Sequence, residues 1–154
     1  MQFPPLRPEQ EDELLAVRRF EELNVLDVIA LQAELEAAQR AGFPNERQRD
    51  RHFDRHGDSL RVAAADAYGA LAAEIQKNPE RVFSAYKPKG TQGTILRWVF
   101  TRGNVLVVVG VFGTEAFVMT CHRAKIDRLD EGFASLDDYL KERDDGKRMV
   151  ELEL

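Results

Sequence analysis

The segment at 94–122 constrains the fold of this 154-residue chain more than any other part. Apolar and polar side chains alternate at 94–101 and at 115–122, and the stretch at 105–111 is apolar throughout. Alternation is typical of half-buried strands, and a continuous apolar run is typical of a central strand covered on both faces. Because only short turn segments separate the three strands, we expect them to pair antiparallel.

Strict alternation also predicts which side chains of the strand at 115–122 are buried. The core side would carry Phe117, Met119 and Cys121, and the polar side would carry Ala116, Val118, Thr120 and His122. Side chains two residues apart on one face of a strand are about 7 Å apart. We therefore expect Thr120 and His122 to be neighbours on the sheet, and Cys121 to act as a small buried apolar group.

Helical periodicity dominates the N-terminal half of the chain. Apolar side chains recur at three- and four-residue steps at 9–23, 26–41 and 60–77, which predicts helices there. After these we expect a strand at 81–86, a basic loop at 87–93 with Lys87 and Lys89, a helix at 136–143 and an edge strand at 147–154. The predicted class is α+β, with N-terminal helices followed by a curved antiparallel sheet of about four strands. We divide the chain into an acidic helical segment at 1–44, a core at 45–125 and an acidic helix and strand at 126–154.

A further helix is predicted at 46–56, with Asn45 as its N-cap. Phe53 is its one large apolar residue, so this helix should lie at a surface and be anchored there by Phe53. Gly57 is expected to end the helix in a left-handed conformation, and Asp58 or Ser59 is expected to cap the next helix.

Charge is segregated along the chain, which has a net charge of −5. Residues 1–44 carry nine acidic and four basic side chains, residues 45–125 eight and thirteen, and residues 126–154 ten and five. All three histidines fall in the basic segment. A basic segment between acidic flanks indicates a polyanion-binding surface, although charges on solvated helix faces would give the same pattern.

The compartment is constrained by what the sequence lacks. No apolar run reaches the roughly 18 residues that a membrane span needs, and the N-terminus does not have the basic and then apolar pattern of a signal peptide. The single cysteine excludes an internal disulfide. We expect a cytoplasmic protein with no membrane partner, and secretion without a cleaved signal remains compatible with the sequence.

His52 and His56 lie four residues apart, a spacing that places both imidazoles on one helix face. Two imidazoles of near-neutral pKa can take and give a proton within one turnover, as RNA phosphodiester cleavage requires. With His122 or Cys121 the pair could instead hold zinc, although no His-Glu-x-x-His pattern of a metalloprotease is present. A third interpretation is a polar helix surface on which the histidines have no role.

The segment His52-Phe53-Asp54-Arg55-His56-Gly57 resembles the His-Phe-x-(Lys/Arg)-His-Gly segment of phage- and toxin-associated nuclease domains. These domains belong to the barnase/EndoU/colicin/RelE-like superfamily, which has the BECR fold. The resemblance covers about residues 45–125 and leaves out the helices at 9–41 and the tail at 126–154. It implies helices followed by a curved antiparallel sheet, and a toxin-like endoribonuclease that uses no metal or other cofactor and cleaves RNA by 2′-hydroxyl attack.

The resemblance also implies a set of site residues. His52 and His56 match the helix histidines, Arg55 matches the basic position between them, and Arg97 and Thr120 match strand positions of the active site. From the predicted faces we add His122, and the further basic candidates for binding RNA are Arg49, Arg123, Lys87 and Lys89.

RNA is the partner that the resemblance implies, and a toxin of this kind could have an antidote or immunity protein. A different hypothesis is a non-catalytic, phage-derived or partner-binding module that uses the acidic helices at 9–41, through which the chain could also self-associate. In that case alanine at both helix histidines would be tolerated, whereas a polar Leu14/Phe20 face would lose the partner.

Overall fold

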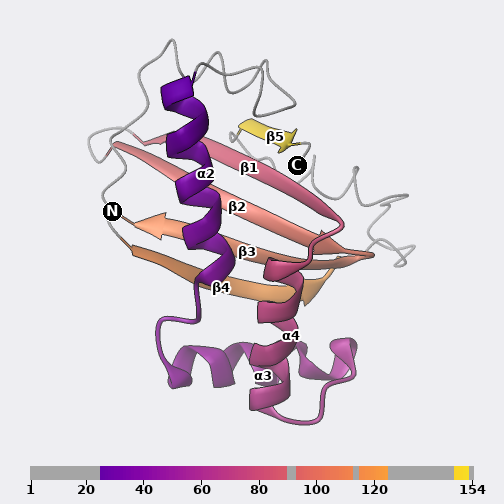
Figure 1. Ribbon diagram of the computed structural model, residues 1–154. Coiled ribbons are helices and arrows are strands. Elements are labelled where there is room, and N and C mark those ends of the chain that lie inside the picture. Colours follow the sequence, from indigo (N-terminus) through magenta and orange to yellow (C-terminus); the bar gives the residue numbers. More distant parts are fainter. Residues whose placement is uncertain (1–24, 90–92, 113–114, 125–147, 153–154) are drawn as a thin grey trace.

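The computed structural model describes residues 25–89, 93–112, 115–124 and 148–152 (Figure 1). In this part of the chain three helices precede an antiparallel sheet, so the predicted α+β class is confirmed. The helices predicted at 9–23 and 136–143 lie outside the described residues. None of the described helices is long and apolar enough to cross a membrane.

The sheet has five strands in the order β4-β3-β2-β1-β5. They are β1 (Arg81–Lys89), β2 (Gly93–Arg102), β3 (Val105–Phe112), β4 (Glu115–Arg123) and β5 (Arg148–Leu152). The first four form a meander, in which a turn at Gly103 with a φ of 57° joins β2 to β3. The predicted edge strand at 147–154 is confirmed, because β5 pairs with β1 at the edge opposite β4.

The predicted loop at 87–93 is wrong over most of its length. The ladder between β1 and β2 continues beyond Tyr86, and it pairs Lys87 with Ile95 and Lys89 with Gly93. A paired strand supplies partners for backbone groups that a loop would leave to water. The antiparallel ladder therefore outweighs the weak strand propensity of this segment.

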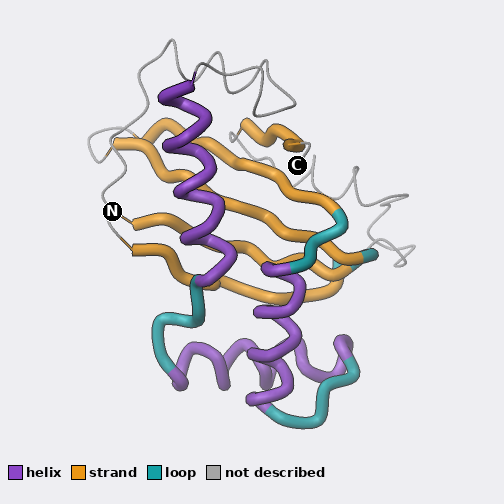
Figure 2. Tube along the Cα trace, viewed as in Figure 1, coloured by secondary structure: helices purple, strands orange, loops and turns teal. Residues whose placement is uncertain are grey.

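The three helices are α2 (Val25–Arg40), α3 (Glu46–Leu60) and α4 (Ala65–Lys77). Figure 2 shows α2 and α4 crossing the same face of the sheet, and α3 lying beyond its β4 edge. The contacts agree, because α2 and α4 pack on the sheet and on each other, whereas α3 packs on β4 and α4.

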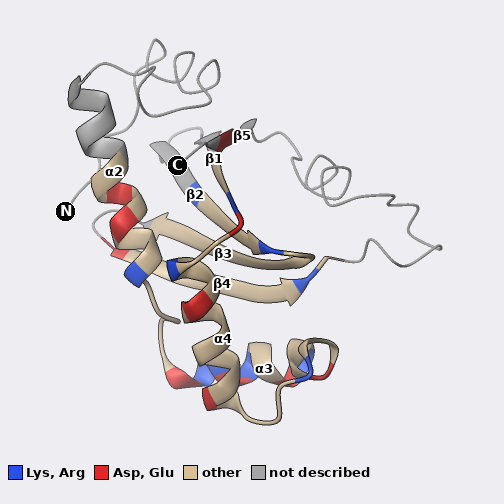
Figure 3. Ribbon diagram, turned by 45° about the vertical axis from the view of Figure 1, so that its right-hand side comes forward, with Lys and Arg blue, Asp and Glu red and all other residues tan. Residues whose placement is uncertain are grey.

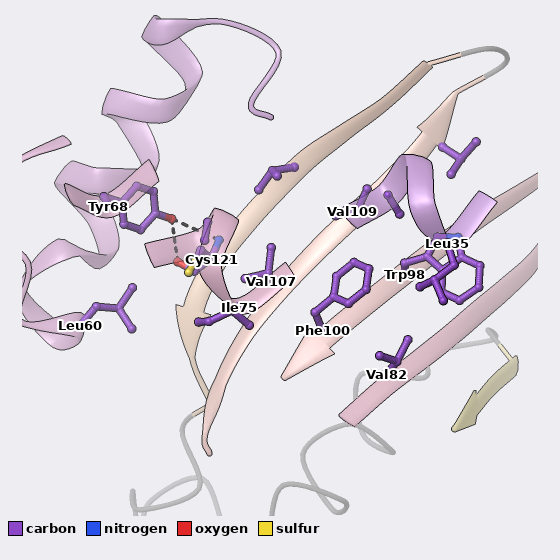
Figure 4. Close-up of a cluster of buried hydrophobic side chains, with 14 residues drawn as sticks. Leu35, Leu60, Tyr68, Ile75, Val82, Trp98, Phe100, Val107, Val109 and Cys121 are labelled. Atoms are coloured by element: carbon purple, nitrogen blue, oxygen red, sulfur yellow. Dashed lines mark hydrogen bonds between the residues drawn. The ribbon is translucent and has the colours of Figure 1, made fainter. Parts of the chain in front are cut away.

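The core lies between the sheet and the helices (Figure 4). Trp98 and Phe100 of β2 are fully buried and point toward the helices, as the predicted alternation requires. Leu35 and Ala38 join α2 to the same core. The Gln76 amide of α4 donates hydrogen bonds to the carbonyls of Ala38 (2.9 Å) and Ala41 (2.8 Å), which supplies partners for the C-terminal end of α2.

The predicted start of α3 is confirmed, and its predicted end at residue 56 is wrong. The Gln48 backbone N–H donates to Asn45 Oδ1 at 2.9 Å, so Asn45 is the N-cap. The helix continues through Gly57 to Leu60, and Arg61 is the residue that adopts the left-handed conformation. Asp58 and Ser59 therefore lie inside α3 rather than capping α4.

Gly57 stays helical because the Phe53 ring covers it. A Cβ at Gly57 would come within 2.6 Å of Phe53 Cε2 and 2.7 Å of Phe53 Cδ2. Phe53 also packs against the core, with its ring centroid 6.1 Å from that of Tyr68. The glycine thus permits a close approach of the ring that anchors α3, which is a tertiary requirement rather than a helix-ending signal.

We expect Gly57→Ala to lower the free energy of unfolding by about 1–2 kcal/mol, because the displaced Phe53 ring costs more than the helix propensity of alanine returns. Gly69→Ala is the matched control within a helix. Its Cβ would meet only the flexible Arg49 side chain, at 3.3 Å, so it should be neutral or stabilising. Urea denaturation of both variants measures the difference, and equal stability of the two would contradict this role of Gly57.

Candidate active site

β4 contains a β-bulge that decides which of its side chains face the helices. Val108 of β3 pairs with Thr120, but the next residue, Val109, pairs with Val118. Met119 is therefore an extra residue on β4, and two residues of this strand face one residue of its partner.

The bulge changes the faces that strict alternation predicted. Val118 and Cys121 lie three residues apart, and both are buried in the core. The predicted burial of Cys121 is confirmed, whereas the assignment of Phe117 and Met119 to the core and of Ala116 and Val118 to the polar side is wrong. The extra residue shifts the alternation by one position, so the residues on either side of it follow different parities.

Three imidazoles form a row where α3 packs on β4. The rings of His52 and His56 are 6.1 Å apart between centroids and only 13° from parallel, so the prediction that they share one helix face is confirmed. The His56 ring lies 5.5 Å from that of His122 on β4. We call His52, His56 and His122 the histidine row. All three are half-buried, so part of each remains open to solvent.

Thr120 lies beside the histidine row, as its predicted proximity to His122 required. Its Oγ1 is 3.3 Å from His122 Nδ1, within hydrogen-bond distance. Thr120 and His122 pair with Val108 and Leu106 of β3, which places both side chains on the face of the sheet opposite to Cys121. His122 nevertheless reaches His56 of α3, because β4 is an edge strand and α3 lies along that edge.

Tyr68 of α4 joins the histidine row to the core, and in the sequence it falls among the recurring apolar side chains of the helix predicted at 60–77. Its hydroxyl donates to the Cys121 carbonyl at 2.6 Å and accepts from the Cys121 N–H at 3.2 Å (Figure 4). Burial raises the pKa of the Tyr68 hydroxyl, so it keeps its proton. A tyrosine in an otherwise apolar stripe was the available signal, because a buried phenol needs a polar partner.

Phe43 was not among the predicted site residues, because it lies between the helices predicted at 26–41 and 46–56 and belongs to no periodic pattern. Its ring centroid lies 6.0 Å from that of His52 and 5.6 Å from that of Tyr68. The adjacent Gly42 carbonyl accepts a hydrogen bond from the Val118 N–H at 2.8 Å. The segment before α3 is thus tied to the edge of β4, and its aromatic ring packs beside the first histidine of the row.

His52 has the electrostatic environment of a neutral imidazole. Burial lowers the pKa of the His52 imidazole below its ordinary value, and the charges of Arg55 and Arg51 lower it further. His52 Nδ1 is buried and has no hydrogen-bond partner among the described residues. His52 is therefore uncharged at neutral pH, and its exchange of protons would take place at Nε2.

The basic residues proposed for RNA binding are not all near the histidine row. Arg55 is exposed on α3, and its charge lowers the pKa of His52. Arg123 follows His122 on β4, where its Nε donates to the Ser59 carbonyl at 3.2 Å. Arg49 instead forms ion pairs with Asp50 (3.2 Å) and Asp66 (3.1 Å). Figure 3 shows that α3 carries charges of both signs.

Arg97, Lys87 and Lys89 belong to more distant strands. Arg97 is on β2, two strands from β4, a separation of about 10 Å. Its register, opposite Gly110, places it on the same face of the sheet as Thr120. Lys87 and Lys89 are on β1, three strands from β4, which is about 14 Å. The structure does not bring these three positions into contact with the histidine row.

A zinc site finds no support in the geometry. No group of three or more His, Cys, Asp or Glu side chains within the described ranges could hold a metal ion. Burial raises the pKa of the Cys121 thiol to about 12, so it stays protonated and is a poor ligand or nucleophile. Cys121 and His122 also point to opposite faces of β4, as expected for adjacent residues of a strand.

The arrangement at the α3–β4 junction can carry out proton transfer. It combines three neighbouring imidazoles, of which that of His52 is neutral, with a hydroxyl and with guanidinium groups beside them. Acid–base catalysis on a phosphodiester needs groups of these kinds. Comparison of the chain with protein-family models, with curated proteins and with solved structures finds no match.

Proposed function

We propose that the protein is a metal-independent endoribonuclease of the toxin-like kind that the His-Phe-x-(Lys/Arg)-His-Gly resemblance implies. The observation that carries the proposal is the histidine row. His52 and His56 are four residues apart on α3, and His122 comes 66 residues after His56, on β4. The three rings nevertheless lie side by side at a partly exposed junction, with centroid distances of 6.1 Å between His52 and His56 and 5.5 Å between His56 and His122. A helix surface with idle histidines would not require a third imidazole to meet it from a strand.

The chemistry assigns complementary roles to the histidines. His52, which is neutral, takes the proton of the ribose 2′-hydroxyl as its oxygen attacks the adjacent phosphorus. The bond from phosphorus to the 5′-oxygen breaks, and His56 in its protonated form gives a proton to that leaving oxygen. The products are a 2′,3′-cyclic phosphate and a 5′-hydroxyl, so atoms and charge balance without a metal.

Charge that builds on the phosphate needs cationic neighbours. Arg51 and Arg55 are exposed on α3, close enough to His52 to lower its pKa. Arg123 follows His122 on β4. These three guanidiniums lie nearer to the histidine row than Arg97 does and would supply the electrostatic stabilisation, with Thr120 as a hydrogen-bonding hydroxyl.

The test uses the purified full chain, free of any inhibitor protein, with tRNA and mRNA in the presence of EDTA. We expect fragments that end in a 2′,3′-cyclic phosphate and a 5′-hydroxyl, and we expect His56→Ala to remove both the cleavage and any toxicity in cells. Asp54→Asn, an exposed substitution on the same helix, is the matched control and should keep the activity.

Intact RNA with the wild-type chain, together with a His56→Ala variant that is no less toxic, would refute the proposal. Folded variants with alanine at both helix histidines and unchanged behaviour would then favour the partner-binding module. Its predicted contact face at Leu14 and Phe20 lies outside the described residues.

A further inference from the structure

The face of the sheet opposite α2 and α4, which we call the outer face, is buried although no described helix or strand lies over it (Figure 2). Phe83 of β1 pairs there with Val99 of β2, and Thr101 of β2 pairs with Leu106 of β3. These four residues are only 1–6% exposed, and none belongs to the core cluster beneath the helices. Another part of the chain or another molecule must therefore cover the outer face.

Neighbouring side chains within the sheet do not explain this burial. Side chains on a strand stand roughly perpendicular to the sheet, so a face without a second layer stays open to water. The Arg81 guanidinium lies 4.9 Å from the centroid of the Phe83 ring and shields that ring alone. Thr101 Oγ1 is buried without a hydrogen-bond partner in the described parts of the chain, so its cover is apolar or only loosely fitted.

We propose that the outer face is the docking surface for the chain's own segment 125–147, which connects β4 to β5. β4 and β5 are the two edge strands of the sheet. Four antiparallel pairings separate them, so they run in the same direction. Their connection must therefore start at one end of the sheet and finish at the opposite end and the opposite edge, which requires a crossover over one of the two faces.

The hand of the crossover selects the outer face. Connections between strands of the same direction in one sheet are right-handed in about 98% of cases. In Figure 1, α2 lies in front of the sheet, and β4 below and β5 above both point to the right. A right-handed path from β4 to β5 then passes behind the sheet, on its outer face. The front face is already occupied by α2 and α4.

The length and the apolar pattern of the segment fit this path. The two edges of a five-stranded sheet are about 19 Å apart, and residues 125–147 supply 23 residues to cross between them. The eight-residue helix predicted at 136–143 would cover about 12 Å of the distance. Leu136, Tyr139 and Leu140 are spaced so that they share one side of this helix, and an apolar stripe of that kind packs on a sheet.

Charge supports the same pairing. Residues 125–147 carry eight acidic and five basic side chains. The outer face carries Arg81 of β1, whose Nε is 2.8 Å from Glu151 Oε1 of β5, and Arg97 of β2, which is on the same side of its strand as Val99. Arg97, which the resemblance assigned to the active site, would therefore face an acidic segment of its own chain.

Docking also determines the side from which a ligand reaches the histidine row. Thr120 and His122 extend the outer face onto β4, where they pair with Val108 and Leu106. The docked segment would border them on that face, and RNA would approach over α3, which carries exposed arginines. This consequence alone rests on the proposed function.

The experiment identifies the occupant by methyl NOESY on the full chain with ¹³C-labelled isoleucine, leucine and valine methyl groups. The reporters on the outer face are the methyl groups of Val99, Leu106 and Val108. We expect cross-peaks from these reporters to methyl groups of the segment, such as those of Leu136 and Leu140. The methyl groups of Val107 and Val109 are the internal control, because they alternate with the reporters on β3 and face the helices, and they should show no cross-peaks to the segment.

The Leu140→Ser variant should shift the signals of the outer-face reporters and leave those of Val107 and Val109 in place. Asp138→Asn, on the other side of the predicted helix, is the matched control and should leave both sets unchanged. If Leu140→Ser does not fold, the cross-peaks of the wild type decide the question.

Three results would overturn the proposal: no cross-peaks between the reporters and the segment, cross-peaks to Leu14 and Leu15 of the N-terminal segment in their place, or cross-peaks that appear only between differently labelled chains in a mixed sample. The last would identify a second copy as the occupant. Intact RNA together with the expected cross-peaks would refute the nuclease alone, and cleavage of RNA without them would refute only the docking.

Discussion

Replacing His56 with alanine should lower the rate of RNA cleavage by about 10²–10⁴-fold, the range expected for loss of a general acid or base. His56 is the middle ring of the histidine row and neighbours both His52 and His122. Its removal therefore takes away the proposed proton donor and also the ring that lies between the two outer imidazoles. Single-turnover cleavage of a defined RNA measures the chemical step without product release.

The double variant tests whether the row acts as one unit. If His122 works through His56, then His122→Ala should cost activity in the wild type but little more in the His56→Ala background. Asp54→Asn supplies the control for a change on the same exposed helix. Multiplicative losses in the double variant would show that the two histidines act independently, and would contradict proton exchange between them.

Stability should fall steeply with rising pH because of Glu34, a residue of α2. Only 6% of Glu34 is exposed, and its buried Oε1 has no hydrogen-bond partner in the described parts of the chain. Burial raises the pKa of this carboxyl from 4.5 to about 8. Below pH 4.5 the carboxyl is protonated in both the folded and the unfolded chain, so folding there carries no cost of charge burial.

Between pH 4.5 and pH 8 the unfolded chain releases this proton and the folded chain keeps it. The free energy of unfolding should then fall by about 1.4 kcal/mol per pH unit, a total loss of about 5 kcal/mol that is complete above pH 8. His52 acts in the opposite direction, because its lowered pKa removes stability as the pH falls below 6.5. The two effects are separable by mutation.

Urea denaturation between pH 5 and pH 9 measures this dependence. Glu34→Gln has no charge to bury, so its stability should exceed that of the wild type by a margin that grows by about 4 kcal/mol over this range. Glu36→Gln, an exposed position on the same helix, should follow the wild-type curve. Parallel curves for the wild type and Glu34→Gln would mean that Glu34 ionises normally in the folded chain.

Several features of the site could be predicted because they depend on short-range sequence alone. The spacing of His52 and His56 places both rings on one helix face wherever that helix packs, and the Asn45 side chain caps α3 through a bond three residues away. The proximity of Thr120 and His122 follows in the same way from the pleat of a single strand.

Other features could not be predicted, because their causes lie far apart in the chain. Gly57 remains inside α3 because of where the Phe53 ring packs, although glycine at that point is also a good helix-ending signal. The bulge at Met119 shifts the faces of β4, and a period-two pattern contains no mark of an extra residue. Burial of Glu34 is likewise set by what α2 packs against and not by its neighbours in sequence.

The sequence by itself determined the α+β class, the meander of strands and the shared face of two histidines, because these depend on periodicity and on contacts within a few residues. Only the tertiary structure decided that His122, rather than Arg97, meets His56, and that Tyr68 holds the strand that carries it. Those contacts join α3, α4 and the edge strand β4, and the packing of three separate elements is not encoded in the local pattern of any one of them.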